Sequence, residues 1–328
     1  MNLNFSAIKE SKNLLAFSAG VDSSALFFLL LKQNIPFDIA IVNYNVRVQS
    51  KDEVNYAKEL ALKYNKQIYI KDIKLESTSN FEKTARDIRY KFFEDIIDEN
   101  SYETLITAHQ LNDKLEWFLM QLTKGAGLVE LIGFNEFEQK ENYKVYKPLL
   151  KITKEELENF LKQENIKYFI DNSNFDEKYK RNYFRHNFSD KLLCEYTNGI
   201  KKSFEYLQND INSLNIEIKP IKVFDKLEIY KNQNDNNLNI RIIDNSLKKR
   251  GFLLSSAQRE EILKQKEITI SHKINISIKE DFIWICPNVS SIMDKKFKEI
   301  CRINKIPKNV RNYIYYKKID IKELGTVN

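Results

Sequence analysis

Residues 14–26, LLAFSAGVDSSAL, decide the fold of this chain. The apolar run at 14–17 predicts a buried strand, and Asp22 and Ser23 open an apolar segment that is long enough for a helix. A turn of small residues between a strand and a helix lets backbone N–H groups approach a phosphate, with the positive end of the helix dipole behind them. The stretch therefore predicts a phosphate-binding loop, lined by Ser18, Ala19, Gly20, Val21, Asp22 and Ser23.

Asp22 adds a candidate metal ligand to this loop. A carboxylate there can hold a Mg²⁺ ion that screens the phosphate charge, and the hydroxyls of Ser18 and Ser23 add hydrogen-bond donors. The alternative is a plain helix cap, because Asp or Ser before an apolar run is a common N-cap. Neither the G-x-x-x-x-G-K-S/T motif nor the G-x-G-x-x-G motif is present, so the loop fits neither of these nucleotide fingerprints.

Composition narrows the class of protein. A chain of 328 residues suffices for two or three domains, and 42% hydrophobic with 30% charged residues is typical of a folded, soluble protein. The longest apolar run, 25–31, is far shorter than the ~20 residues of a membrane span, and residues 1–11 lack an apolar signal core, so we expect a cytoplasmic location. Cys194, Cys286 and Cys301 are scattered, which argues against a disulfide framework or a zinc site. The net charge of +7 fits a polyanionic partner.

Strand and helix patterns alternate along the first 122 residues. Further strands are expected at 37–42, 67–70 and 105–108, and helices at 24–31, 52–64, 81–100 and 112–122. This order predicts an α/β fold with a doubly wound, parallel, Rossmann-like sheet, whose ligands gather at the carboxyl ends of the strands. The first loop and the ends of the strands at Val42 and Ala108 should therefore converge.

Two groups of polar residues follow the later strands. Arg86 and Arg89 lie three apart in the long helix, and they either clamp phosphates or form part of a solvated face. Asp113 and Glu116 share one face of a first helical turn, where they bind Mg²⁺ or the ammonium of an amine substrate, or simply complement the helix dipole. His109 precedes them; it is either a packed histidine or a residue within reach of a phosphate.

The loop resembles the S-G-G-x-D-S pyrophosphate loop of the N-type ATP pyrophosphatases, with Ala19 where that family usually has Gly. A positive φ at this position would disfavour the alanine Cβ. The ordered motifs of the first 190 residues together resemble the tRNA(Ile)-lysidine synthases: SAGVDS (18–23), NYNVR (43–47), ARDIRY (85–90), TAHQLNDKLE (107–116), KGAGL (124–128), KPLL (147–150), DNSN (171–174) and RNYFRH (181–186). The family usually has histidines at Ile41, Tyr44 and Gln110 and an aspartate at Asn112, so roles of those side chains do not transfer.

The resemblance implies a fold like the adenine nucleotide alpha hydrolases and a reaction in two steps. ATP, with Mg²⁺, adenylates O2 of the wobble cytidine in a tRNA(Ile) with a CAU anticodon; the ε-amine of free L-lysine then attacks C2 and displaces AMP. The implied catalytic residues are Asp22, Arg86, His109, Asp113 and Glu116, with Asp22 and Asp113 as metal ligands. The implied tRNA-facing residues are Asn174, Arg181, Asn182, Arg185 and His186. We expect no membrane partner, and a homodimer is possible.

We place the domain boundary near residue 213. Residues 1–213 form the expected ATP-binding catalytic domain, with a helical tRNA-facing segment at about 135–213, and residues 214–328 a smaller α+β tRNA-recognition domain. Residues 136–143 are expected to be a surface loop. The basic and aromatic stretch at 305–316 either grips RNA or forms an ordinary strand edge.

Three other readings stay open. A related tRNA thiolase would use the same loop, but such enzymes rely on cysteines near the site. An amidating synthetase of the GMP or NAD type would need an ammonia source and lacks the RNYFRH element. A non-catalytic tRNA-binding module would account for Ala19 and the missing histidines.

Overall fold

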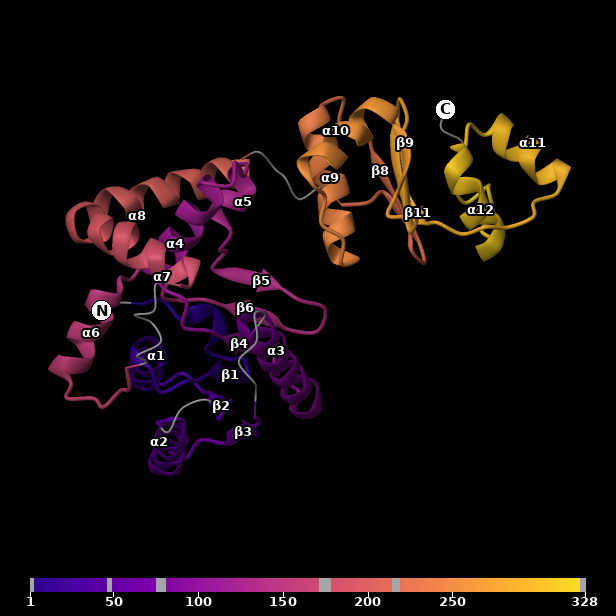
Figure 1. The fold of residues 1–328 in the computed structure, drawn as a ribbon. Helices are drawn as coiled ribbons and strands as arrows, with labels where there is room; N and C mark the ends of the chain where they lie inside the picture. The colour runs from indigo at the N-terminus through magenta and orange to yellow at the C-terminus, as the bar shows by residue number, and fades with distance from the viewer. Residues whose placement is uncertain (1–2, 46–48, 75–80, 171–177, 214–218, 325–328) are drawn as a thin grey trace. The chain divides into compact units, whose positions relative to one another are not determined.

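The computed structural model describes residues 3–45, 49–74, 81–170, 178–213 and 219–324 (Figure 1). The chain separates into two compact units, Met1–Ile211 and Asn212–Asn328. Each unit has its own sheet and its own hydrophobic core. Within the described ranges, every helix is too short or too polar to cross a lipid bilayer.

The first unit is built on a mostly parallel sheet with the strand order β3-β2-β1-β4-β6-β5. Strand β1 pairs in parallel with β2 and β4, and β5 pairs with β6 in the antiparallel direction at one edge. The strands are β1 (Asn13–Ala16), β2 (Asp38–Asn43), β3 (Ile68–Asp72), β4 (Thr104–Ile106), β5 (Phe137–Gln139) and β6 (Lys144–Tyr146). The expectation of a doubly wound parallel sheet is confirmed.

Helices cover both faces of this sheet because neighbouring strand residues point to opposite sides. Leu15 packs into a core with α1 (Val21–Lys32), α2 (Ser50–Lys63) and α6 (Lys154–Gln163). Leu14 packs instead with α3 (Phe81–Asn100), and Figure 1 shows α3 separated from α1 and α2 by the strands. The two layers fix the carboxyl ends of β1 and β4 side by side.

A helical group lies beyond the end of β4. Leu111 and Leu115 of α4 (Leu111–Leu122) pack against Leu193 and Phe204 of α8 (Asp190–Ser213). Between them come α5 (Leu128–Ile132), α7 (Lys180–Phe184) and a π-helical turn, η3 (Arg185–Ser189). A short 3₁₀ turn, η1 (Ser6–Ile8), precedes β1.

The second unit holds an antiparallel sheet between two helical layers. Its strand order is β7-β8-β11-β10-β9, with β7 (Lys222–Phe224), β8 (Leu227–Lys231), β9 (Glu267–Ile270), β10 (Ile274–Ile278) and β11 (Phe282–Pro287). One core joins the sheet to α9 (Asn236–Lys249) and α10 (Ser256–Gln265), and another joins it to α11 (Lys295–Ile303) and α12 (Lys308–Lys317). The expected smaller α+β part is thus present.

Two local expectations are wrong. The polar segment 136–143 is more than a loop, because Phe137–Gln139 forms β5 and its Phe137 ring stacks on Tyr146 at 4.3 Å. The stretch 305–316 is no strand edge, because it contains helix α12. Tyr313 of that helix is buried and donates a hydrogen bond to Asp225 Oδ2 (2.9 Å), so this tyrosine serves packing.

Candidate active site

The predicted phosphate loop connects β1 to α1 with a fixed geometry. The backbone N–H of Ser18 donates to Ser23 Oγ (3.2 Å), and the two hydroxyl oxygens lie 3.1 Å apart. The N–H of Ser24 donates to the carbonyl of Gly20 (2.9 Å), which begins the helix. The loop therefore presents small residues and the amino end of a twelve-residue helix at the carboxyl edge of the sheet.

Ala19 adopts a left-handed backbone conformation, with φ of 58°. Its side chain is fully buried, and its carbonyl accepts a hydrogen bond from the N–H of Phe169 (2.9 Å). A Cβ in this region costs roughly 1–2 kcal/mol, which glycine avoids. Ala19 thus has the positive φ that disfavours an alanine at this position. Its buried side chain and the hydrogen bond to its carbonyl hold the residue in this conformation.

Asp22, in the first turn of α1, has an unsatisfied carboxylate oxygen. Among the described residues, no donor reaches Asp22 Oδ1, which is sealed from solvent. Burial, followed by the negative charge of Asp113, raises the pKa of Asp22 to about 7, and the cations Lys154 and Arg185 act against this rise. A bare carboxylate that is costly to ionise in isolation is suited to a cationic ligand.

His109 follows β4 and faces several cations. Its Nδ1 lies 2.9 Å from Thr107 Oγ1, and its ring lies 5.3 Å from the ring of Phe134. Burial lowers the pKa of His109 to about 4; Asp113 opposes this, whereas the charges of Lys147, Arg181 and Arg86 add to it. The imidazole is therefore neutral at physiological pH.

Asp113 and Glu116 lie on one face of the first turn of α4, and two arginines bind them. Glu116 is completely buried and accepts hydrogen bonds from Arg181 Nε and Arg185 Nε, both at 2.7 Å. Arg181 also pairs with Asp113, whose second carboxylate oxygen accepts from the N–H of Gln110 (3.0 Å). We call these four residues, Asp113, Glu116, Arg181 and Arg185, the acid–arginine cluster.

The arginines set the ionisation of this cluster. Burial alone would raise the pKa of Asp113, but the charge of Arg181 and the hydrogen bond from the N–H of Gln110 oppose it, and the pKa lies below its ordinary value. Burial would likewise lower the pKa of Arg185, whereas its hydrogen bonds to Glu116 raise the pKa above the ordinary value. Asp113 is therefore held in its charged form, and each carboxylate of the cluster has an arginine partner.

The other predicted site residues are placed as follows. Arg86 is exposed on α3 with its guanidinium 4.8 Å from the centre of the Tyr90 ring. Asn182 is buried in α7, and His186 is half-buried in η3. Asn174 lies outside the described residues. Sequence reasoning missed Lys154, the first residue of α6, whose positive charge acts on Asp22. The only signal in the sequence was the predicted start of a helix at this residue.

Departures from the family pattern have structural roles here. The side chain of Gln110 caps α4 by accepting from the N–H of Asn112 (2.5 Å). Asn112 itself donates to Asp190 of α8 (2.9 Å) and accepts from the N–H of Lys154 (3.1 Å). Tyr44 donates to the carbonyl of Ala85 (2.8 Å), and Ile41 is buried in the core. These side chains tie elements together around the site.

Metal ligands are limited in number. Within the ranges that the structure describes, no group of three or more His, Cys, Asp or Glu side chains could hold a metal ion. Both oxygens of Asp113 are occupied, by Arg181 and by the N–H of Gln110. Asp22 is the better candidate ligand, since Mg²⁺ commonly takes one or two carboxylates and completes its shell with phosphate and water.

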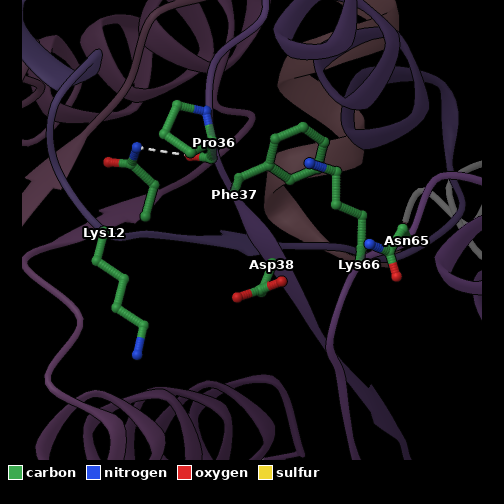
Figure 2. Close-up of a pocket in the computed structure, with 7 residues that line it drawn as sticks. Lys12, Pro36, Phe37, Asp38, Asn65 and Lys66 are labelled. Carbon is green, nitrogen blue, oxygen red and sulfur yellow. Dashed lines mark hydrogen bonds between the residues drawn. The ribbon is translucent and has the colours of Figure 1, made fainter.

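A separate cavity of about 200 Å³ lies near the amino ends of β1 and β2 (Figure 2). Asp38 there accepts from Tyr102 Oη (2.6 Å) and from the N–H of Gln67 (2.7 Å). The ammonium of Lys66 lies 4.4 Å from the centre of the Phe37 ring, and Figure 2 shows Lys12 on the other side of Asp38. The cavity belongs to the edge of the sheet opposite the phosphate loop.

A family model described as a PP-loop domain matches residues 2–192, and the chain belongs to this class of ATP-binding proteins. Curated relatives include a tRNA(Ile)-lysidine synthase from Campylobacter jejuni strain RM1221, 47% identical over 97% of both chains. The one from Wolinella succinogenes is 43% identical over 95% of both chains. This chain is a member of the tRNA(Ile)-lysidine synthase family.

A solved structure supports the fold independently. The U34-tRNA thiolase from Methanococcus maripaludis, determined with its [4Fe-4S] cluster, aligns with a TM-score of 0.54 at 21% identity. The alignment covers 67% of this chain and 78% of the thiolase. At this identity the likeness concerns the fold.

Proposed function

We propose that this chain uses ATP to ligate lysine to C2 of the wobble cytidine in the CAU anticodon of tRNA(Ile), which forms lysidine. The observation that carries the proposal is identity of 47% over nearly the full length of a tRNA(Ile)-lysidine synthase. The product changes the amino-acid identity of the tRNA from methionine to isoleucine and its codon from AUG to AUA.

In the first step, O2 of the cytidine attacks the α-phosphorus of ATP, and the bond to pyrophosphate breaks. The backbone N–H groups around Gly20 and the hydroxyls of Ser18 and Ser23 support phosphate binding at the amino end of α1. Lys154 and Arg86 supply positive charge at the edges of the site. Such preorganised charge stabilises the negative charge that develops during adenylation.

Asp22 would hold Mg²⁺ in this step. Its buried Oδ1 has no donor among the described residues, which fits a cationic ligand. When bound, Mg²⁺ neutralises charge on the phosphate oxygens and on the leaving pyrophosphate. The predicted second ligand, Asp113, is already neutralised by Arg181, so we assign Asp113 to charge balance and substrate orientation.

In the second step, the ε-amine of lysine attacks C2, the C2–O2 bond breaks, and AMP leaves with that oxygen. The attacking amine must be neutral, and it loses a proton as the new bond forms. Neutral His109, with Nδ1 fixed by Thr107, can accept a hydrogen bond from this amine at its other nitrogen. The carboxylates of the acid–arginine cluster would orient the lysine.

The thiolase alternative has no support from the cysteines. Cys194 lies on α8, and Cys286 and Cys301 are buried in the second unit. In our proposal the second unit is the tRNA-recognition domain. We also propose a homodimer, and the mass of the protein in solution tests this oligomeric state.

The test is a modification assay with purified protein, ATP, Mg²⁺, labelled lysine and a transcript of the CAU-anticodon tRNA(Ile). We expect label in this tRNA, none in a methionine tRNA, and loss of label with Asp22→Ala. Label in neither tRNA, with ATP consumed, would point to a different nucleophile, and sulfur donors would then be compared.

A further inference from the structure

Three aromatic rings are exposed on the segment that carries the arginines of the site. Tyr179, Tyr183 and Phe188 are 38%, 45% and 42% exposed. The rings of Tyr183 and Phe188 lie 5.9 Å apart, and the buried ring of Phe184 lies within 6.0 Å of both. The three exposed residues, Tyr179, Tyr183 and Phe188, are here called the aromatic face.

The π-helical turn creates this face. Tyr179 is the N-cap residue of α7, and its carbonyl accepts a hydrogen bond from the N–H of Tyr183 (3.1 Å), one helical turn further on. Phe188 is five residues beyond Tyr183, which in a regular α-helix would turn it away. The widened turn of Arg185–Ser189 brings it back beside Tyr183. Turns of this kind inside helices are frequent at functional sites.

The aromatic face lies on the same short segment as two arginines of the candidate active site. Arg181 and Arg185, on the same short segment, reach Glu116 at 2.7 Å. Lys180 lies with its ammonium 5.7 Å from the centre of the Phe184 ring. Exposed rings beside cations are the combination with which proteins bind single-stranded nucleic acid, through stacking and phosphate contacts.

We propose that Tyr183 and Phe188, supported by Tyr179, stack on the unpaired anticodon-loop base next to the wobble cytidine. This inference rests on the proposed function. The cytidine must leave the base stack to enter the site, and its neighbour then loses a stacking partner. Because every base has a π-face, an aromatic ring can replace that partner whatever the base. These residues are thus positioning residues for the tRNA.

The experiment measures binding of a stem–loop RNA that carries the CAU anticodon loop of tRNA(Ile) to the full chain. We expect Tyr183→Leu and Phe188→Leu each to weaken binding roughly 5- to 150-fold, which corresponds to the loss of one stacking contact. Tyr183→Phe should restore wild-type affinity. With 5-iodouridine in the loop, light should crosslink the wild-type protein at the aromatic face.

Tyr206→Leu is the matched control, because Tyr206 is 57% exposed on α8 and has no part in the proposal. Its RNA affinity should be unchanged. ATP binding should be equal in all variants, since the phosphate loop is untouched. Unchanged RNA binding in both leucine variants would overturn the proposal, as would an equal loss of ATP binding, which indicates a structural role.

Two further readouts separate this proposal from its rivals. In the lysine assay, Tyr183→Leu should raise the KM for tRNA more than it lowers kcat. If the wild-type chain binds the stem–loop through Tyr183 but transfers no lysine, the proposed function fails while the aromatic face stands. If Tyr183→Leu changes only the oligomeric mass of the protein, the aromatic face is an interface between two copies of the chain and the proposal is wrong.

Discussion

Glu116 is the residue on which the charges of the candidate site converge. It is fully buried, and both Arg181 and Arg185 donate to it. A buried carboxylate of this kind is tolerated only because its partners neutralise it, and removing one side of such a pair leaves an uncompensated charge. The residue therefore matters for stability as well as for the reaction.

Glu116→Gln should destabilise the protein by about 3 kcal/mol, because Arg181 and Arg185 lose their shared counter-charge. Urea unfolding measures the free energy. Glu299→Gln is the control: the Glu299–Arg302 pair on α11 is exposed to solvent, so little change is expected there. Equal effects of the two substitutions would show that burial of the cluster is unimportant.

Gly133→Ala should destabilise the fold by at least about 2 kcal/mol. Gly133 has φ of 61°, and an added Cβ would lie 2.0 Å from Trp117 Nε1, which donates to the carbonyl of Glu130. Gly199→Ala, in α8 with nothing within 4 Å of the added atom, should instead be neutral or slightly stabilising. Thermal unfolding of both variants checks the contrast, and a tolerant Gly133→Ala would contradict it.

Asp22→Asn should stabilise the protein more at high pH than at low pH. The pKa of Asp22 is raised from 3.8 to about 7. Between these two values the unfolded chain ionises while the folded chain keeps its proton, so folding stability falls as the pH rises towards 7. The asparagine variant lacks this loss and should gain up to about 4 kcal/mol on wild type above pH 7 in metal-free buffer. A difference that does not depend on pH would refute the assignment.

The positions of single site residues could be predicted from the sequence where a local pattern determines them. The loop, Asp22 and the carboxylates at the start of α4 follow from helix-start patterns. The pairing of Glu116 with Arg185 did not follow, because the two are 69 residues apart and each pattern also fits a separate role. Only the packing of α4 against α7 and η3 decides that they meet.

At the scale of elements, long periodic segments were predicted well. The helix expected at 81–100 has the same bounds as α3. The short edge strands β5 and β7 were missed, since three residues carry too little alternation; the five-residue strand β8 was missed as well. Helix α12 was not predicted, because its mixture of basic and aromatic residues also fits an RNA-binding stretch or a strand edge.

The capping boxes of α6 and α10 allow a matched test of an element's start. Thr153 and Ser255 each accept from the N–H three residues on, at 3.1 Å and 3.2 Å. Alanine at either position should cost about 1 kcal/mol of stability. Only Thr153→Ala should also weaken ATP binding, because α6 carries Lys154 to Asp22. Calorimetric titration with ATP distinguishes the two, and equal ATP affinity would remove Lys154 from the site.

On the scale of the whole molecule, the two units have separate cores. Clusters around Leu15 and Leu14 stabilise the first unit, and those around Ile276 and Trp284 stabilise the second. The sequence indicated two parts through a change from alternating strands and helices to a mixed order. It could not indicate the three-layer arrangement of the second unit, which depends on tertiary packing.

A chain ending at residue 213 should fold and bind ATP with wild-type affinity, because the phosphate loop and its cores lie within the first unit. It should bind full-length tRNA(Ile) more weakly than the whole chain does, while its affinity for the stem–loop RNA stays the same. Gel-shift and calorimetric titrations measure these affinities. Equal tRNA affinity for the short and long chains would remove residues 214–328 from tRNA recognition.

The acid–arginine cluster has a thermodynamic consequence for the order of substrates. The guanidinium groups of Arg181 and Arg185 cannot neutralise the carboxylates and an RNA phosphate with the same N–H groups at once. When a phosphate draws them away, the carboxylates gain affinity for an ammonium group, and linkage makes the effect reciprocal. The amino-acid substrate and the RNA would then bind with positive cooperativity, because each raises the affinity of the cluster for the other.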